Sequence, residues 1–242
     1  MERKISAGSY DLNKWLYGGY ETDVITTIYG PAGTGKTNLC LLVAVSQAKK
    51  GNKVIFIDTE GGFSVDRFKQ IAGENFEAIL ENVLILKPTT FQEQQDSFAR
   101  LLKELKETKN IGAIIVDGMT MLYRLELANA KNDDRKASEV NSQLASQLRT
   151  LSEISRTKNI PVIVTNQVYS EFLSREEYED GKEKKVFMVG GDILKYWSKC
   201  IIEIQNLQGK RKAILRKHRS LPEKEMLFVI TKEGIAKARR FF

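Results

Sequence analysis

The chain has 242 residues, of which 42% are hydrophobic, and carries a formal net charge of +7 at pH 7. This length can bury a sizeable core, and no Pro- or Ser-rich stretch divides the chain. One histidine and two cysteines exclude histidine-rich metal sites and a disulfide framework, and they favour a reduced, cytoplasmic compartment. Without an apolar signal core or a bilayer-length apolar run, no membrane partner is expected.

Predicted strands and helices alternate along the chain. Buried strands are predicted from short apolar runs at 24–29, 54–57, 83–86, 111–116 and 161–164. Helices are predicted from Asn38 onward and over 65–72, 91–106 and 135–156. The alternation predicts an α/β fold with a mostly parallel sheet flanked by helices. Short strands at 200–204, 213–215 and 227–230, with a turn at 206–210, predict a C-terminal antiparallel extension.

A glycine-rich run follows the first predicted strand and leads into the first predicted helix. It consists of Gly30, Pro31, Ala32, Gly33, Thr34, Gly35, Lys36 and Thr37, and Asn38 comes next. This pattern is typical of a P-loop, in which glycines let backbone N–H groups surround phosphate oxygens at the positive end of a helix dipole. We expect Lys36 to act on the β- and γ-phosphates and Thr37 to ligate Mg²⁺.

Three polar residues follow other predicted strands. Asp117 ends the strand at 111–116, where a carboxylate can reach the magnesium shell through water, as in the Walker B pattern. Glu60 ends the next strand after the P-loop helix; we expect that strand beside the P-loop strand, with Glu60 activating a water molecule. The alternative role for Glu60 is a helix N-cap. Gln167 is placed to hydrogen-bond a γ-phosphate or its attacking water.

With these residues in order, the chain resembles the RecA-type recombinase superfamily, most closely its archaeal RadA and RadB types. The resemblance is carried by SYDLNKWLYGG (9–19), DTEGGF (58–63), VTNQV (164–168), GGDIL (190–194), LPE (221–223) and FVITKEGI (228–235). It implies a single RecA-like ATPase core domain over 1–242, without the N-terminal helix-hairpin-helix domain of the RadA type. That build is typical of the RadB type, a recombinase paralogue.

The resemblance also implies roles for individual residues. It makes ATP the nucleotide, Glu60 the catalytic base, Gln167 the γ-phosphate sensor and Arg67 a contact to adenine. Lys217 and Arg219 fall in a stretch that caps the ATP of the adjacent subunit in relatives, where an acidic residue and a proline stand instead. Both positions are basic here, so we expect a cation reaching across the interface, as arginine fingers do.

DNA is the partner that the resemblance implies, through the segments after Asp117 and after Gln167. The second segment, 170–189, has a net charge of −2 and a hairpin turn predicted at Asp180 and Gly181, so it is a poor phosphate contact. Basic residues that offer a better contact are Lys210, Arg211, Lys212 and Arg216. A solvated face is the alternative reading of this basic run.

The resulting expectation is an ATP-binding, weakly ATP-hydrolysing, DNA-binding accessory protein of recombination and repair, with DNA-dependent turnover. Its further partners would be a recombinase, a Holliday-junction nuclease or a second copy in a homodimer. Two alternatives stay open: a KaiC-like signalling ATPase without a DNA role, and a scaffold that uses ATP structurally. DNA-stimulated turnover, partner-dependent activity, or ring assembly with autophosphorylation would distinguish the three.

Overall fold

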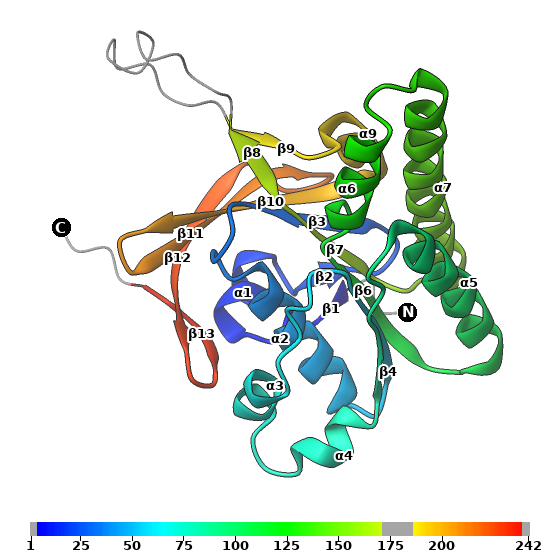
Figure 1. Cartoon of the computed structure of the whole chain (residues 1–242). Helices are drawn as coiled ribbons and strands as arrows, with labels where there is room; N and C mark the ends of the chain where they lie inside the picture. The colour runs from blue at the N-terminus through cyan, green and yellow to red at the C-terminus, as the bar shows by residue number, and fades with distance from the viewer. Residues whose placement is uncertain (1–3, 171–185, 239–242) are drawn as a thin grey trace, which may run out of the picture.

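The structure, a computed structural model, describes residues 4–170 and 186–238. A nine-stranded sheet runs through it in the order β13-β12-β11-β10-β3-β7-β6-β4-β5 (Figure 1). The parallel part comprises β10 (Ser198–Leu207), β3 (Ile25–Tyr29), β7 (Val162–Asn166), β6 (Ile111–Asp117), β4 (Lys53–Asp58) and β5 (Val83–Leu86). The antiparallel part adds β11 (Lys210–His218), β12 (Lys224–Thr231) and β13 (Gly234–Lys237). The predicted α/β fold with an antiparallel C-terminal extension is confirmed.

Helices cover both faces of the parallel strands (Figure 1). One face carries α1 (Tyr10–Trp15), α2 (Lys36–Ala48), α3 (Val65–Ala72) and α4 (Phe76–Leu80). The other carries α5 (Phe91–Glu107), α6 (Met121–Asn129), α7 (Asp134–Lys158) and α9 (Gly191–Trp197). Two small sheets complete the described part, formed by β1 (Lys4–Ile5) with β2 (Tyr20–Glu21) and by β8 (Val168–Ser170) with β9 (Val186–Met188).

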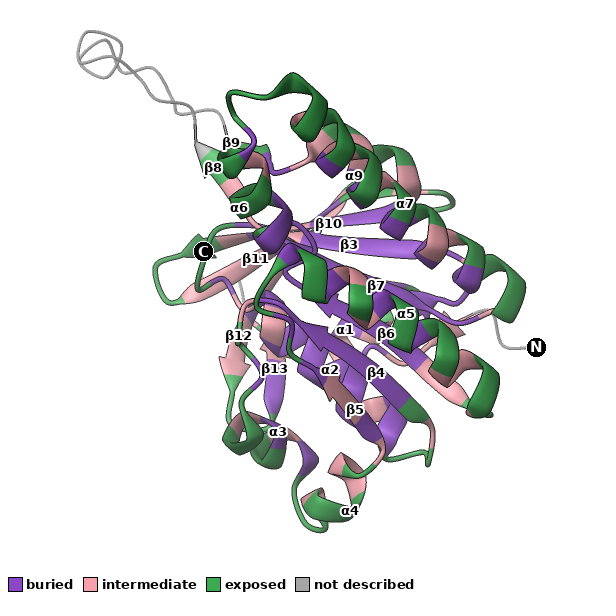
Figure 2. Cartoon of the chain, turned by 45° about the vertical axis from the view of Figure 1, so that its right-hand side comes forward, coloured by how far each residue is buried: buried purple, intermediate pink, exposed green. Residues whose placement is uncertain are grey.

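Each central strand contributes to two apolar cores, one on either side of the sheet. In β4, Phe56 belongs to the core under α2, whereas Ile55 and Ile57 belong to the core under α5 and α7. Successive side chains of a strand point to opposite faces, so a strand covered on both sides must be apolar throughout. Figure 2 shows the result, with buried strands between helices whose outer surfaces are exposed. The core holds the strand ends that carry the polar site residues in fixed positions.

The strand order corrects one expectation. β4, which we expected beside the P-loop strand β3, is separated from it by β7 and β6. The neighbours of β3 are instead β7 and β10. The reason is that the crossover through α2 leaves space for two strands that come later in the chain. Glu60 must therefore reach the nucleotide site from the end of β4, which is the third strand from the P-loop strand β3.

Membrane association was not expected. Within the described residues, no helix combines the length and the apolar character needed to cross a bilayer.

Candidate functional site

The P-loop lies between the end of β3 and the start of α2, as predicted. Gly35 adopts φ 97° at the N-cap of α2, a left-handed conformation that glycine adopts most readily. No side chain caps this helix, and its first turn contains no acidic residue. The first N–H groups of a helix have no partner within the helix, so this end of α2 is suited to an anion. Gly30 is needed for another reason, since a Cβ there would lie 2.2 Å from the Ile204 carbonyl oxygen.

Lys36 is buried beneath this loop, with 5% of its surface exposed. Its ammonium group donates to the carbonyl oxygens of Gly30 and Pro31, at 2.9 Å each, and to Gln167 Oε1 at 3.4 Å. Burial lowers the pKa of Lys36, and the carboxylates of Glu60 and Asp117 oppose that shift. The lysine is thus held next to the N-terminus of α2, where it adds a positive charge to the helix dipole.

Thr37 and Asp117 lie together and form the candidate magnesium site. The Asp117 Oδ1 atom accepts from the Thr165 hydroxyl at 2.6 Å, whereas its buried Oδ2 atom has no hydrogen-bond partner among the described residues. A Cβ on Gly62 would lie 3.2 Å from Thr37 Oγ1 and 3.5 Å from Asp117 Oδ2, so this glycine keeps the space between them open. An unpartnered buried carboxylate oxygen facing a hydroxyl suits a hard cation that retains several waters.

Burial also raises the pKa of Asp117, to about 6, against the lowering effect of Thr165 and Thr37. The neighbouring carboxylates Glu60 and Asp58 raise it further. A buried negative charge is unfavourable without a cation beside it. This cost supports the same conclusion as the unpartnered oxygen, namely that Asp117 is placed for a positively charged ligand.

Glu60 lies across the site from the P-loop lysine, and Gln167 connects the two. The Gln167 Nε2 atom donates to Glu60 Oε2 at 3.0 Å, while Gln167 Oε1 accepts from Lys36. The other carboxylate oxygen of Glu60 is buried and has no partner among the described residues. The N-cap of α3 is Ser64, whose hydroxyl accepts from the Arg67 N–H, so Glu60 does not serve as that cap. A carboxylate oxygen without a partner can accept a proton from water.

Asp58 shapes the loop that carries Glu60, and we did not single it out from the sequence. Its two carboxylate oxygens accept from the N–H groups of Gly62 and Phe63, at 3.0 Å each. Thr59 adds a second anchor by donating from its hydroxyl to the Gly118 carbonyl at 2.7 Å. The sequence carried one signal for this role. Three polar residues stand in succession at the end of a buried strand, and only one of them can reach the nucleotide, so the other two can anchor the loop.

Arg67, the predicted adenine contact, borders the same site. Its Nε atom donates to Asn38 Oδ1 at 2.7 Å, next to the P-loop. Its terminal nitrogens donate to carbonyl oxygens of the turn between β12 and β13, at Thr231 and Lys232, at 2.8 Å each. The guanidinium group therefore connects α2 with the C-terminal hairpin. Contact with adenine stays a prediction.

Lys217 and Arg219 lie at the opposite edge of the sheet from the P-loop of the same chain. Lys217 pairs with Ile201 near the start of β10, and its ammonium group donates to the Lys195 carbonyl at 2.7 Å. Arg219 binds both oxygens of Asp23, at 2.6 and 2.8 Å, and the hydrogen bonds to Asp23 hold the pKa of Arg219 above its usual value. Any contact of these two residues with ATP would have to involve the nucleotide of another subunit.

Among the predicted DNA-contacting residues, Lys212 and Arg216 are paired with carboxylates of the described part of the chain. Lys212 lies 2.6 Å from Glu225. Arg216 lies 2.6 Å from Glu203 and 2.9 Å from Glu223. These ion pairs partly balance the charge that would attract phosphate.

Lys210 and Arg211 begin β11, next to the two-residue turn of Gln208 and Gly209. The predicted turn at 206–210 is therefore present. The acidic segment with its expected turn at Asp180 and Gly181 lies outside the described residues. Lys210 and Arg211 are half-buried and lie next to the hairpin tip.

Comparison with known proteins places these observations in a family context. A family model described as Rad51 matches residues 3–238. A DNA repair and recombination protein RadB of Methanobrevibacter smithii is 40% identical over 228 residues, covering 93% of this chain and 92% of the relative. Its counterpart in Methanocaldococcus jannaschii is 42% identical over 224 residues, covering 93% and 98%. That of Methanococcoides burtonii is 41% identical over 237 residues, covering 97% and 98%.

Proposed function

Since this chain belongs to the Rad51 family, we propose that it is an ATP-binding accessory protein of DNA repair and recombination. Its ATP hydrolysis is weak and depends on DNA, and the bound nucleotide acts chiefly as a switch on DNA or partner binding. The observation that carries this proposal is the bridge through Gln167. One amide contacts both the P-loop lysine and the candidate base Glu60, at 3.4 and 3.0 Å.

The P-loop and the strand ends divide the chemistry of ATP hydrolysis among them. The N–H groups at the start of α2 and the ammonium group of Lys36 bind the phosphates. Thr37 and Asp117 hold Mg²⁺, which neutralises phosphate charge when it is bound. Glu60 orients a water molecule and accepts its proton through the free carboxylate oxygen. These are the groups that a γ-phosphate transfer to water requires.

Gln167 gives the site a means to report its nucleotide state. A γ-phosphate that binds Lys36 competes with the Gln167 amide for the same ammonium group. Gln167 directly precedes β8, which leads into the segment predicted to face DNA. A change of hydrogen-bond partner at Gln167 can therefore shift the position of β8, as in switch segments that are ordered by a γ-phosphate. The switch is a consequence of where this amide lies in the chain.

Hydrolysis is weak because the groups near the phosphates come from one chain alone. The positions that cap ATP from a second subunit, Lys217 and Arg219, lie at the opposite sheet edge. Turnover therefore depends on assembly, through a homodimer or another partner such as a recombinase or junction nuclease. The signalling alternative is not favoured, because the relatives are named for DNA repair and recombination.

The test is a salt titration of DNA binding with ATP, with ADP and without nucleotide. Wild-type protein should bind labelled single-stranded DNA at least fivefold more tightly with ATP than with ADP. The Lys36→Ala variant should bind equally in all three conditions. If DNA affinity is the same in all three nucleotide conditions and in the Lys36→Ala variant, the switch is excluded. Turnover that is stimulated by a protein partner but not by DNA would favour a scaffold instead.

A further inference from the structure

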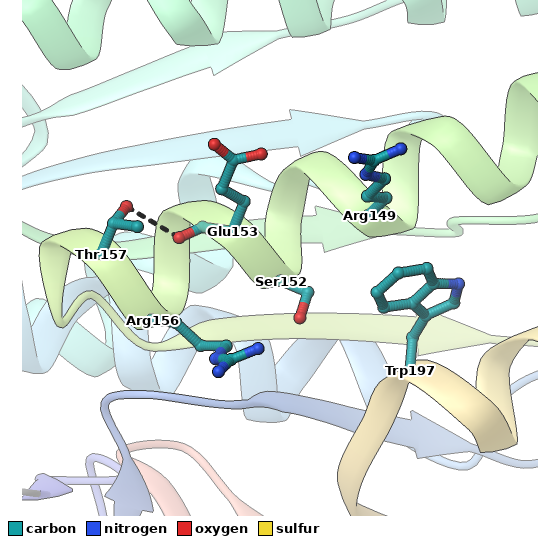
Figure 3. Close-up of a pocket in the computed structure, with 6 residues that line it drawn as sticks. All are labelled: Arg149, Ser152, Glu153, Arg156, Thr157 and Trp197. Carbon is teal, nitrogen blue, oxygen red and sulfur yellow. Dashed lines mark hydrogen bonds between the residues drawn. The ribbon is translucent and has the colours of Figure 1, made fainter.

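A groove lies between α7 and α9, at the edge of the sheet where β3 and β10 begin. One part of it has a volume of about 480 Å³ and is lined by Arg149, Ser152, Glu153, Arg156, Thr157 and Trp197 (Figure 3). A second part, of about 400 Å³, shares Ser152, Arg156 and Trp197 and extends to Asp23 at the start of β3. The two parts are therefore continuous. The P-loop follows the other end of β3, so this groove is separate from the nucleotide site.

The groove carries cations that are not balanced by ion pairs. Among the residues that the structure describes, Arg149, Arg156 and Lys199 form no salt bridge. Arg219 lies in the same groove, but Asp23 holds its guanidinium group. Three unpaired cations favour an anionic ligand.

Aromatic side chains lie beside these cations. Figure 3 shows Trp197 reaching from α9 toward Ser152 of α7, with Arg149 and Arg156 on either side of Ser152 along the helix. Tyr196 is 71% exposed and packs edge-on against Trp197 at a centroid distance of 5.2 Å. Tryptophan, tyrosine and arginine are the residues most often found at the centres of protein interfaces. This composition points to a protein ligand.

Nucleic acid fits this groove less well. The segments predicted to face DNA follow Asp117 and Gln167, at the opposite edge of the sheet. A small apolar molecule is also disfavoured, because charged and polar side chains make up most of the lining.

The spacing of the arginines defines the ligand further. Arg149 and Arg156 are seven residues apart on α7, a rise of about 10.5 Å over two helical turns. A peptide in the polyproline II conformation has three residues per turn and advances about 3.1 Å per residue, so carboxylates three residues apart lie on one face and span about 9 Å. A residue between them would lie over Ser152, within reach of the Trp197 ring.

We propose that the groove between α7 and α9 binds a short acidic segment of a partner protein, with two carboxylates three residues apart around an aromatic side chain. This goes beyond the proposed function, and within one chain the groove is separate from the nucleotide site, which lies at the other ends of the strands. A partner held here can remain bound while the P-loop side engages nucleotide and DNA.

The test uses fluorescence anisotropy with an array of labelled ten-residue peptides. Each peptide contains one phenylalanine and two aspartates whose spacing is varied, and matched peptides contain lysine in place of aspartate. Wild-type protein should prefer the aspartate peptide with a spacing of three and should not bind the lysine peptides. The double variant Arg149→Glu/Arg156→Glu and the single variant Trp197→Ala should each weaken binding at least tenfold.

The control is Lys136→Glu, which reverses a charge near the other end of α7, at an exposed position outside the groove. It should bind the peptide like wild type, and the charge variants should retain the thermal transition and ATP affinity of wild type. Absence of binding to every array peptide, or equal binding by wild type and the double variant, would overturn the proposal. The proposal would also be overturned if the double variant bound the peptide like wild type but lost binding to a 20-nucleotide oligo-dT, or lost self-association.

Discussion

Gln167 Nε2 donates a hydrogen bond to Glu60 Oε2 at 3.0 Å, across 107 positions of sequence. The bond joins the end of β7 to the loop after β4, strands that are separated in the sheet by β6. The same amide accepts from the Lys36 ammonium group at 3.4 Å, so it connects Glu60 with the P-loop. A candidate base and a candidate sensor thus share one hydrogen bond, and a change at either residue acts on both functions.

Glu60→Gln should abolish most ATP turnover and leave ATP binding nearly intact. Glutamine retains the shape and can still accept from Gln167, but it cannot take a proton from water. Loss of a general base costs roughly 10²- to 10⁴-fold in rate. Phosphate release measures turnover, and a fluorescent ATP analogue measures affinity. Turnover within threefold of wild type would show that Glu60 is not the base.

Gln167→Met should separate ATP binding from its effect on DNA. Methionine has a similar length but no amide, so the links to Glu60 and Lys36 are both lost. We expect ATP affinity within about threefold of wild type, turnover reduced about tenfold, and DNA affinity that no longer differs between ATP and ADP. Gln143→Met on α7, an exposed glutamine, is the matched control. A variant with full nucleotide dependence of DNA binding would exclude the switch through this amide.

Asp117→Asn should stabilise the nucleotide-free protein above pH 6 while weakening Mg²⁺-dependent ATP binding. Because burial raises the folded-state pKa of Asp117 from 3.8 to about 6, the free energy of unfolding falls as the pH rises through this interval. The variant removes that cost, so we expect a gain of about 1 to 3 kcal/mol at pH 7.5.

Urea unfolding at two pH values tests this account of Asp117. At pH 4 most of the gain should be lost, since this pH is close to the unfolded-state pKa of 3.8 and well below the folded-state pKa of about 6. A variant that is equally destabilised at pH 4 and pH 7.5 would instead indicate that Asp117 serves mainly to accept from Thr165.

Lys217→Ala should lower turnover only where subunits are assembled. In the single chain Lys217 lies at the far edge of the sheet from the P-loop. We therefore expect unchanged ATP affinity at low protein concentration, and turnover reduced at least tenfold at concentrations where wild-type activity per subunit rises. Equal losses of affinity and turnover at every concentration would refute a role across an interface.

Lys210→Glu/Arg211→Glu should weaken DNA binding and its dependence on salt. These residues lie at the hairpin tip between β10 and β11, and each phosphate contact contributes about 0.9 to the slope of log affinity against log salt. The slope should fall by about 2, whereas Lys136→Glu should leave it unchanged. An unaltered slope would show that this hairpin tip is a solvated face.

The parts predicted from the sequence are those that local pattern determines. The glycine run at 30–37 requires one backbone shape, and the apolar runs that became β4 and β6 can be buried only as central strands. The prediction of 65–72 as a helix agrees with α3, which Ser64 caps through the Arg67 N–H. By contrast, α1, α4 and α6 were not predicted, because helices of six, five and nine residues show too little periodicity.

Long-range relationships could not be predicted in the same way. The placement of β4 beyond β7 and β6 depends on which strands later in the chain fill the gap. The hydrogen bond from Arg67 to Thr231 spans 164 positions, and the pairing of Arg216 with Glu203 depends on the register of β10 and β11. Nothing in the local sequence around these arginines indicates their partners.

The central claim is that the P-loop, Lys36, Thr37 and Asp117 bind ATP with Mg²⁺ while Glu60 faces the γ-phosphate. A crystal structure with a non-hydrolysable ATP analogue and Mg²⁺ tests it most directly. We predict triphosphate density around the N-terminus of α2, with the metal between Thr37 and Asp117 and a water molecule on Glu60. An empty loop in a crystal soaked at saturating analogue, or Glu60 and Asp117 turned away from the phosphates, would contradict the account.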